Sequence, residues 1–183
     1  QFDFILLEIG GTVGDIESLP FFEAQRQLSL EKGSDYALSV HLTYVPFLKS
    51  ADELKTKPTQ HSVKTLMEFG IRPDILLCRT ERKLSKDIKN KIALFCNVDN
   101  ESVIEARDVN STIYEVPLMF SQNGVGDIIL KKMGMKNNNL NMKTWTKFVQ
   151  RIKNPKYTVK VALVGKYTKY QDSYKSILEA FIH

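Results

Sequence analysis

Three carboxylates and three glycines stand together at residues 8–18, in the segment EIGGTVGDIES. Carboxylate oxygens bind Mg²⁺ and accept hydrogen bonds from sugar hydroxyls, but they repel phosphate. Glu8 follows the apolar run at 4–7, which reads as a buried parallel strand, and open α/β sheets bind ligands at the carboxyl ends of their strands. Glu8 is therefore a candidate ligand for nucleotide-bound Mg²⁺, and an acid that merely caps the next turn fits its position equally well.

The positive charges that a phosphate would need lie downstream, in KTKPTQ at 55–60. Lys55 and Lys57 are two residues apart, so an extended segment would point both side chains the same way. Pro58 and Thr59 then predict a helix start, whose free N–H groups favour anions, and Gln60 adds a neutral donor. Each lysine alone reads as a solvated surface charge. Together, beside a helix start bounded by proline, they favour an anion site.

The composition is that of an ordinary globular protein. The 183 residues are 43% apolar and 26% charged, with a net charge of +5. The lysines are spread along the chain, so small polyanions explain the charge as well as nucleic acid does. No apolar stretch is long enough for a membrane span. The cysteines, Cys78 and Cys96, lie far apart in apolar runs, which predicts reduced thiols in the core of a cytoplasmic protein.

The elements that must position these residues alternate along the chain. We predict helices over 18–33 and 84–98, and over 55–70 a lysine-rich loop that leads into a helix ending at Gly70. We predict strands over 4–7, 36–45, 73–80, 102–106 and 113–116. Lys91 would project from the third helix. This alternation predicts an α/β domain with a largely parallel sheet flanked by helices.

The chain changes character near residue 134. The stretch 134–158 is rich in Asn and Lys around one amphipathic segment, which indicates a linker that carries a helix. Residues 159–183 then read as a fresh strand, loop and helix. Because the sequence starts at once with a strand that needs neighbours, we expect it to be an internal piece of a longer protein.

Several long motifs resemble those of the CTP synthase family, in the family's order and over nearly the whole chain. They are EIGGTVGDIESLPFFEAQRQ, HLTYVP, KTKPTQHSVK, GIRPDILLCR, KIALFCNV, VALVGKY and DSYKSILEA. The resemblance implies that residues 1–133 are the C-terminal half of the synthetase (amidoligase) domain. It makes 134–158 the interdomain linker and 159–183 the first strand and helix of the class I glutamine amidotransferase (glutaminase) domain. The fold implied is that of P-loop NTPases and dethiobiotin synthetase, here without its N-terminal phosphate loop.

The resemblance also implies a reaction. In this family ATP phosphorylates O4 of UTP, and ammonia released from glutamine in the second domain displaces the phosphate to give CTP, which inhibits the enzyme. The implied partners are Mg²⁺ as cofactor, GTP as allosteric activator and a cytoplasmic homotetramer, with neither nucleic acid nor membrane. Since the phosphate loop and the glutaminase triad are not among these residues, we expect the 183-residue chain alone to be inactive.

Site residues follow by matching motif to motif. Glu8 matches the family's Mg²⁺ ligand. The matches to the UTP and CTP site are Asp15, Ile16, Glu17, Lys55, Thr56, Lys57, Pro58, Thr59, Gln60 and Lys91. The matches to the ATP site are Arg107, Asp108 and Val109, with Arg79 expected nearby.

Two other function classes are consistent with parts of the pattern. One is another ATP-dependent ligase on the same fold, of the dethiobiotin synthetase or cobyrinate amidase type, although such enzymes need no pyrimidine triphosphate site like KTKPTQHSVK. The other is a non-catalytic basic binding module, which would need clustered surface lysines and exposed aromatic residues.

Overall fold

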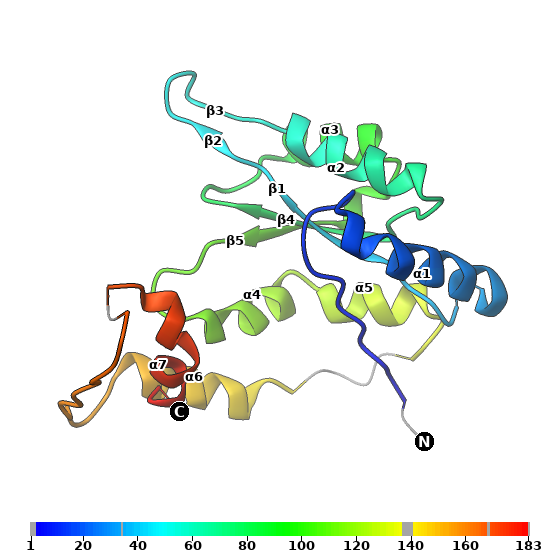
Figure 1. The fold of residues 1–183 in the computed structure, drawn as a ribbon. Helices are drawn as coiled ribbons and strands as arrows, with labels where there is room; N and C mark the ends of the chain where they lie inside the picture. The colour runs from blue at the N-terminus through cyan, green and yellow to red at the C-terminus, as the bar shows by residue number, and fades with distance from the viewer. Residues whose placement is uncertain (1–2, 34, 137–140, 168, 183) are drawn as a thin grey trace. The chain divides into compact units, whose positions relative to one another are not determined.

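The structure is a computed structural model that describes residues 3–33, 35–136, 141–167 and 169–182 (Figure 1). The chain forms two compact units, one of residues 1–108 and 119–140 and the other of residues 109–118 and 141–183. Within the described residues, no helix has both the length and the apolar content needed to cross a bilayer.

The first unit is built on a parallel sheet in the order β1 (Val40–Tyr44), β4 (Ile75–Thr80) and β5 (Val103–Arg107). Both ladders are parallel, and Cys78 of β4 lies opposite Thr43 of β1 and Glu105 of β5. A small antiparallel hairpin, β2 (Phe47–Leu48) and β3 (Glu53–Leu54), follows β1. The predicted α/β fold with a parallel sheet is confirmed.

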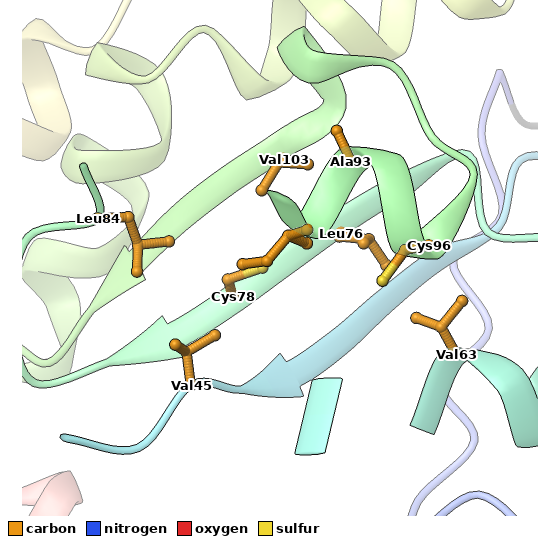
Figure 2. Close-up of a cluster of buried hydrophobic side chains, with 9 residues drawn as sticks. Val45, Val63, Leu76, Cys78, Leu84, Ala93, Cys96 and Val103 are labelled. Carbon is orange, nitrogen blue, oxygen red and sulfur yellow. The ribbon is translucent and has the colours of Figure 1, made fainter. Parts of the chain in front are cut away.

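One face of this sheet carries the larger apolar core, under α2 (Lys57–Glu68) and α3 (Lys86–Cys96) (Figure 2). Its buried members are Val45, Val63, Leu76, Cys78, Leu84, Ile92, Ala93, Cys96 and Val103. Both cysteines are free and buried, as predicted. Strand β4 is central in the sheet and covered on both faces. Its sequence is therefore almost continuously apolar, as in other parallel strands that are buried on both faces.

The opposite face packs on α5 (Val125–Lys132) through Ile75, Ile104 and Val125. The short helix α4 (Val116–Gln122) precedes α5, and the sequence pattern had predicted neither helix. A third cluster joins α1 (Leu19–Lys32) to the end of α2, where the rings of Phe22 and Phe69 stack with centroids 5.4 Å apart.

The second unit contains α6 (Lys143–Lys153), which confirms the helix predicted inside the linker, and α7 (Lys175–Ala180). Trp145 of α6 donates a hydrogen bond from its indole N–H to the carbonyl of Tyr114 at 2.8 Å, and the two rings pack with Phe148. These aromatic contacts fix α6 against the segment around residue 114.

Three predicted strands are absent from the described residues, and the predictions for them were wrong. The run at 4–7 is irregular and exposed, with Leu6 96% exposed, and the run around Val159–Val164 is irregular too. Residues Ile113–Glu115 form a 3₁₀ turn instead of a strand. A β-strand exists only when a second strand supplies its hydrogen bonds, and no described strand pairs with any of these three segments.

Candidate functional site

The carboxyl ends of β1, β4 and β5 lie at one edge of the sheet, because all three strands run in the same direction. The register places Tyr44 opposite Arg79 and Thr80 opposite Arg107. Three of the four residues predicted to bind ATP therefore gather here: Arg79, Arg107 and Asp108. This is the edge at which open α/β sheets bind ligands.

An ion pair organises that edge. Arg79 donates from Nε to Asp108 Oδ1 at 2.8 Å, while the backbone N–H of Asp108 donates to the carbonyl of Thr80 at 3.0 Å. Hydrogen bonding to Asp108, with a smaller Coulomb contribution from the same group, raises the pKa of Arg79. Both side chains are largely exposed, so the pair orients the guanidinium without adding much stability.

Tyr44 and Glu81 extend this group, and the sequence analysis had not singled them out. The Tyr44 hydroxyl donates to Glu81 Oε1 at 3.3 Å, and desolvation together with Glu81 raises the pKa of the phenol. The missed signal was positional, because Tyr44 ends one strand and Glu81 directly follows another. Polar residues at carboxyl ends of parallel strands are site candidates whatever motif contains them.

The first turn of α2 is attached to the end of β1 by buried and part-buried hydrogen bonds. Thr59 is fully buried, and its Oγ1 lies 3.0 Å from the Tyr44 carbonyl oxygen and 3.1 Å from Thr43 Oγ1. Gln60 donates from Nε2 to Thr56 Oγ1 at 2.9 Å, and Thr56 is buried too. The hydroxyls of both threonines are thus engaged by protein groups.

The two lysines do not share an extended segment, and that part of the prediction was wrong. Lys57 is the first residue of α2, and Thr56 before it already has a helical backbone, with φ −88° and ψ −11°. Lys55 follows β3, pairs with Glu53 and donates its backbone N–H to the Pro46 carbonyl at 2.9 Å. Because α2 begins at Lys57, shortly after the β2–β3 hairpin, the direction of the Lys57 side chain is set by a helical backbone and not by an extended one. Lys57 is exposed at the N-terminal end of α2.

The acidic loop at 8–18 is held in a defined turn. Asp15 accepts a hydrogen bond from the Thr12 N–H at 2.7 Å, and Ser18 donates from Oγ to the Gly10 carbonyl at 3.1 Å. Gly11 and Gly14 have φ of +84° and +105°, which L-residues with side chains rarely adopt. The loop is anchored on α1 and α2 through Ile9 and Val13, which pack against the third apolar cluster.

Within this loop the candidate residues differ in exposure. Asp15 is half-buried, whereas Ile16 and Glu17 lie exposed in a 3₁₀ turn at Ile16–Ser18. A Cβ on Gly14 would lie 3.7 Å from the Thr65 methyl group, so the loop lies beside the second half of α2. The loop thus lies beside α2 at Thr65, about two helical turns along from Lys57 at the start of the same helix.

Glu8 is exposed at the start of the loop, and an added Cβ on Gly10 would lie 3.5 Å from its Oε1. Among the described residues, no group of three or more His, Cys, Asp or Glu side chains could hold a metal ion. A caged site is therefore absent from this part of the chain. A single accessible carboxylate still fits Mg²⁺ that arrives with a nucleotide, since such ions take one or two protein carboxylates besides phosphate oxygens and water.

Two predicted residues lie apart from these groups. Lys91 is exposed on α3 next to the buried Ile92. Val109 follows Asp108 in the chain but belongs to the second unit, where it is half-buried.

Comparison with known proteins identifies the family. The family model described as the CTP synthase N-terminus matches residues 1–135. CTP synthases of Christiangramia forsetii, Koribacter versatilis and Aquifex aeolicus are 58%, 58% and 54% identical to this chain over 184, 181 and 181 residues. These alignments cover 100%, 99% and 99% of the chain but only 34%, 32% and 34% of the relatives. The chain spans about a third of the length of these curated relatives and belongs to the CTP synthase family.

Proposed function

We propose that the full-length protein containing this chain converts UTP, ATP and ammonia into CTP. ATP would phosphorylate O4 of UTP, and ammonia would then displace that phosphate at C4. The observation that supports this most directly is the shared edge of the sheet: the start of α2 is hydrogen-bonded to the end of β1, and the Arg79–Asp108 pair lies at the ends of the neighbouring strands. Two anionic nucleotides that must react with each other need such adjacent sites.

In this proposal the chain contributes two half-sites. The loop at 15–17, the segment 55–60 apart from the enclosed Thr59, and Lys91 receive UTP, and CTP as inhibitor uses the same triphosphate pocket. Arg79, Arg107, Asp108 and Val109 hold ATP. Charge explains which residues take which part of the nucleotide. Lysines at a helix start attract phosphates, while the acidic loop suits a ribose and a metal ion.

Glu8 would hold the Mg²⁺ that accompanies the nucleotides, as an accessible carboxylate at the start of the loop. Bound there, the ion would neutralise charge on the transferred phosphoryl group and its neighbours. The other contribution of the protein is to hold the two nucleotides in position. Lysine and arginine side chains fix the two triphosphates, and phosphoryl transfer depends mainly on such positioning and electrostatic stabilisation.

The wider assignments rest on family membership. We propose residues 1–133 as part of the synthetase domain, 134–158 as the linker and 159–183 as the start of a glutaminase domain that supplies ammonia from glutamine. Activation by GTP, assembly into a homotetramer and a cytoplasmic location belong to the same proposal.

The direct test is CTP formation by the full-length protein from UTP, ATP, Mg²⁺ and ammonium. CTP that depends on both nucleotides supports the proposal. ATP turnover that does not need UTP, or binding of ATP without binding of UTP in a titration, contradicts it and favours another ligase of the same fold.

Lys57 and Lys64 offer a matched pair for the UTP site. Both are exposed lysines of α2, two helical turns apart. A charge-assisted contact is worth roughly 1.5–3 kcal/mol, so Lys57→Ala should raise the KM for UTP and the inhibition constant of CTP about 10- to 100-fold. Lys64→Ala should change either value less than twofold. An effect of Lys57→Ala on ATP alone would assign this lysine to the other nucleotide.

A further inference from the structure

The contact between β1 and α2 is partly polar, although it lies inside the fold. His41 Nε2 is 2.8 Å from Ser62 Oγ, and one turn earlier on the helix Thr59 Oγ1 is 3.1 Å from Thr43 Oγ1. Thr43 in turn donates to the sulfur of the buried Cys78 at 3.7 Å. Two hydrogen-bonded pairs thus join the same strand to the same helix, at positions one helical turn apart.

Thr59 has a second partner that distinguishes it from Ser62. Its Oγ1 lies 3.0 Å from the carbonyl oxygen of Tyr44, the last residue of β1. The N–H of the same peptide group, that of Val45, donates to the carbonyl of Arg79 at 2.8 Å. A single planar peptide therefore lies between the first turn of α2 and the end of β4.

This connection is short and stiff. Thr59 and Val45 are both fully buried, so the Thr59 hydroxyl and the Val45 N–H would be shielded from water if either lost its partner, and that loss costs free energy. The carbonyl of Tyr44 and the N–H of Val45 point to opposite sides of one rigid unit. A movement of the start of α2 relative to Arg79 that exceeds the normal range of hydrogen-bond lengths would break one of the two hydrogen bonds.

We infer that Thr59 is a positioning residue for the reaction. Its hydroxyl fixes the start of α2, which carries Lys57, relative to Arg79, through the Tyr44–Val45 peptide. The inference rests on the proposed function, in which these two groups hold UTP and ATP. Thr59 then sets the spacing between the two nucleotides without touching either, because its side chain is fully enclosed by protein. Its place in the KTKPTQ segment had suggested a direct contact instead.

The test uses the full-length protein with saturating nucleotides and ammonium. Thr59→Val removes the hydroxyl and keeps the shape, so kcat for CTP formation should fall at least tenfold. The Kd of UTP alone and of ATP alone should each change less than threefold, because each half-site stays intact. Thr59→Ser restores the hydroxyl and should return kcat to within threefold of wild type.

Ser62→Ala is the matched control. It removes a hydrogen bond between the same strand and helix but leaves the Tyr44–Val45 peptide connected, so kcat should stay within twofold. Should Thr59→Val not fold, Thr59→Ala removes the same hydroxyl without the added methyl group and carries the same expectation.

Two results overturn the inference: kcat within twofold of wild type in the variant without the hydroxyl, or an equal loss in Ser62→Ala. A wild-type protein that forms no CTP contradicts the proposed function instead. A wild type that forms CTP while the Thr59 variant matches it contradicts only the role of Thr59.

Discussion

Gly11 offers a sharp test of whether the turn of the acidic loop matters for nucleotide binding. Its φ is +84°, and a Cβ at this position would lie 2.7 Å from Asp15 Oδ2. That oxygen accepts the hydrogen bond from the Thr12 N–H. Gly11→Ala should therefore both strain the backbone and push the Asp15 carboxylate away from its partner.

The magnitude follows from these two effects. An L-residue in the left-handed region costs about 1–2 kcal/mol. Loss of the exposed Asp15–Thr12 hydrogen bond costs about 0.5–1.5 kcal/mol more. The sum, about 1.5–3.5 kcal/mol, destabilises the observed loop conformation, which positions Asp15 and Glu17. At about 1.4 kcal/mol per factor of ten, binding that needs this conformation weakens about 10- to 300-fold.

The assay is the binding of CTP and UTP to the full-length protein, by titration calorimetry. Gly33→Ala is the matched control, because Gly33 has the same φ of +84° but nothing lies within 4 Å of its added Cβ, and it follows α1, away from the loop. It should lower thermal stability yet leave both affinities within threefold. Wild-type affinity for both nucleotides in Gly11→Ala would show that the turn does not support the site.

Three further changes test the remaining roles. Glu8→Gln keeps the shape but removes the charge proposed to hold Mg²⁺, so ammonia-dependent CTP formation should fall at least 100-fold, and activity within tenfold of wild type would make Glu8 structural. In the proposed site UTP and CTP share a triphosphate pocket but place their bases in different grooves, so Glu17→Lys should raise the inhibition constant of CTP more than the KM for UTP. An unchanged ratio of the two constants would contradict this. Burial raises the pKa of the Cys78 thiol from 9.0 to about 11. The contribution of this thiol to the free energy of unfolding is therefore fully present below pH 9 and is lost as the pH rises toward 11. Urea denaturation at pH 8 and pH 10.5 should show this loss, and a Cys78→Ala variant should show less of it.

The sheet could be predicted where burial alone defines a strand. PDILLCRT is apolar on both faces because β4 is covered by α2 and α3 on one side and by α5 on the other. The runs at 4–7 and 159–164 have the same local pattern but form no ladder in the described residues. Local composition records the tendency to pair, whereas pairing itself depends on a second segment that the pattern does not name.

Helices α4 and α5 were missed for a different reason. Gly124, with φ +71°, separates them, and the short segments on either side give too little periodicity to stand out. Phe120 of α4 and Ile128 and Ile129 of α5 pack against the same apolar cluster, on either side of this glycine. A turn residue in the middle of an amphipathic pattern leaves two short segments, and neither is long enough to predict a helix by its periodicity.

At the site, the sequence supplied the residue types but not their directions. Arg79 and Asp108 could be assigned to one edge because parallel strands end together. The inward direction of Thr59 and the helical start at Lys57 depend on how α2 packs on β1. That packing is a tertiary property, and the motif KTKPTQ reads the same whichever side faces the strand.

The central position of β4 also determines how the molecule would open. Ile75, Leu76, Cys78 and Thr80 are fully buried, and β4 has a parallel partner on each side. Its amide protons should exchange with deuterated solvent only when the sheet as a whole comes apart. In β1, which pairs with β4 alone among the described strands, every second amide faces away from that ladder and should exchange through small local fluctuations. Strand β1, which ends at Tyr44, thus has a backbone ladder along one side only, and among the described strands local opening of the sheet would begin at its free amides, far sooner than any loss of the core.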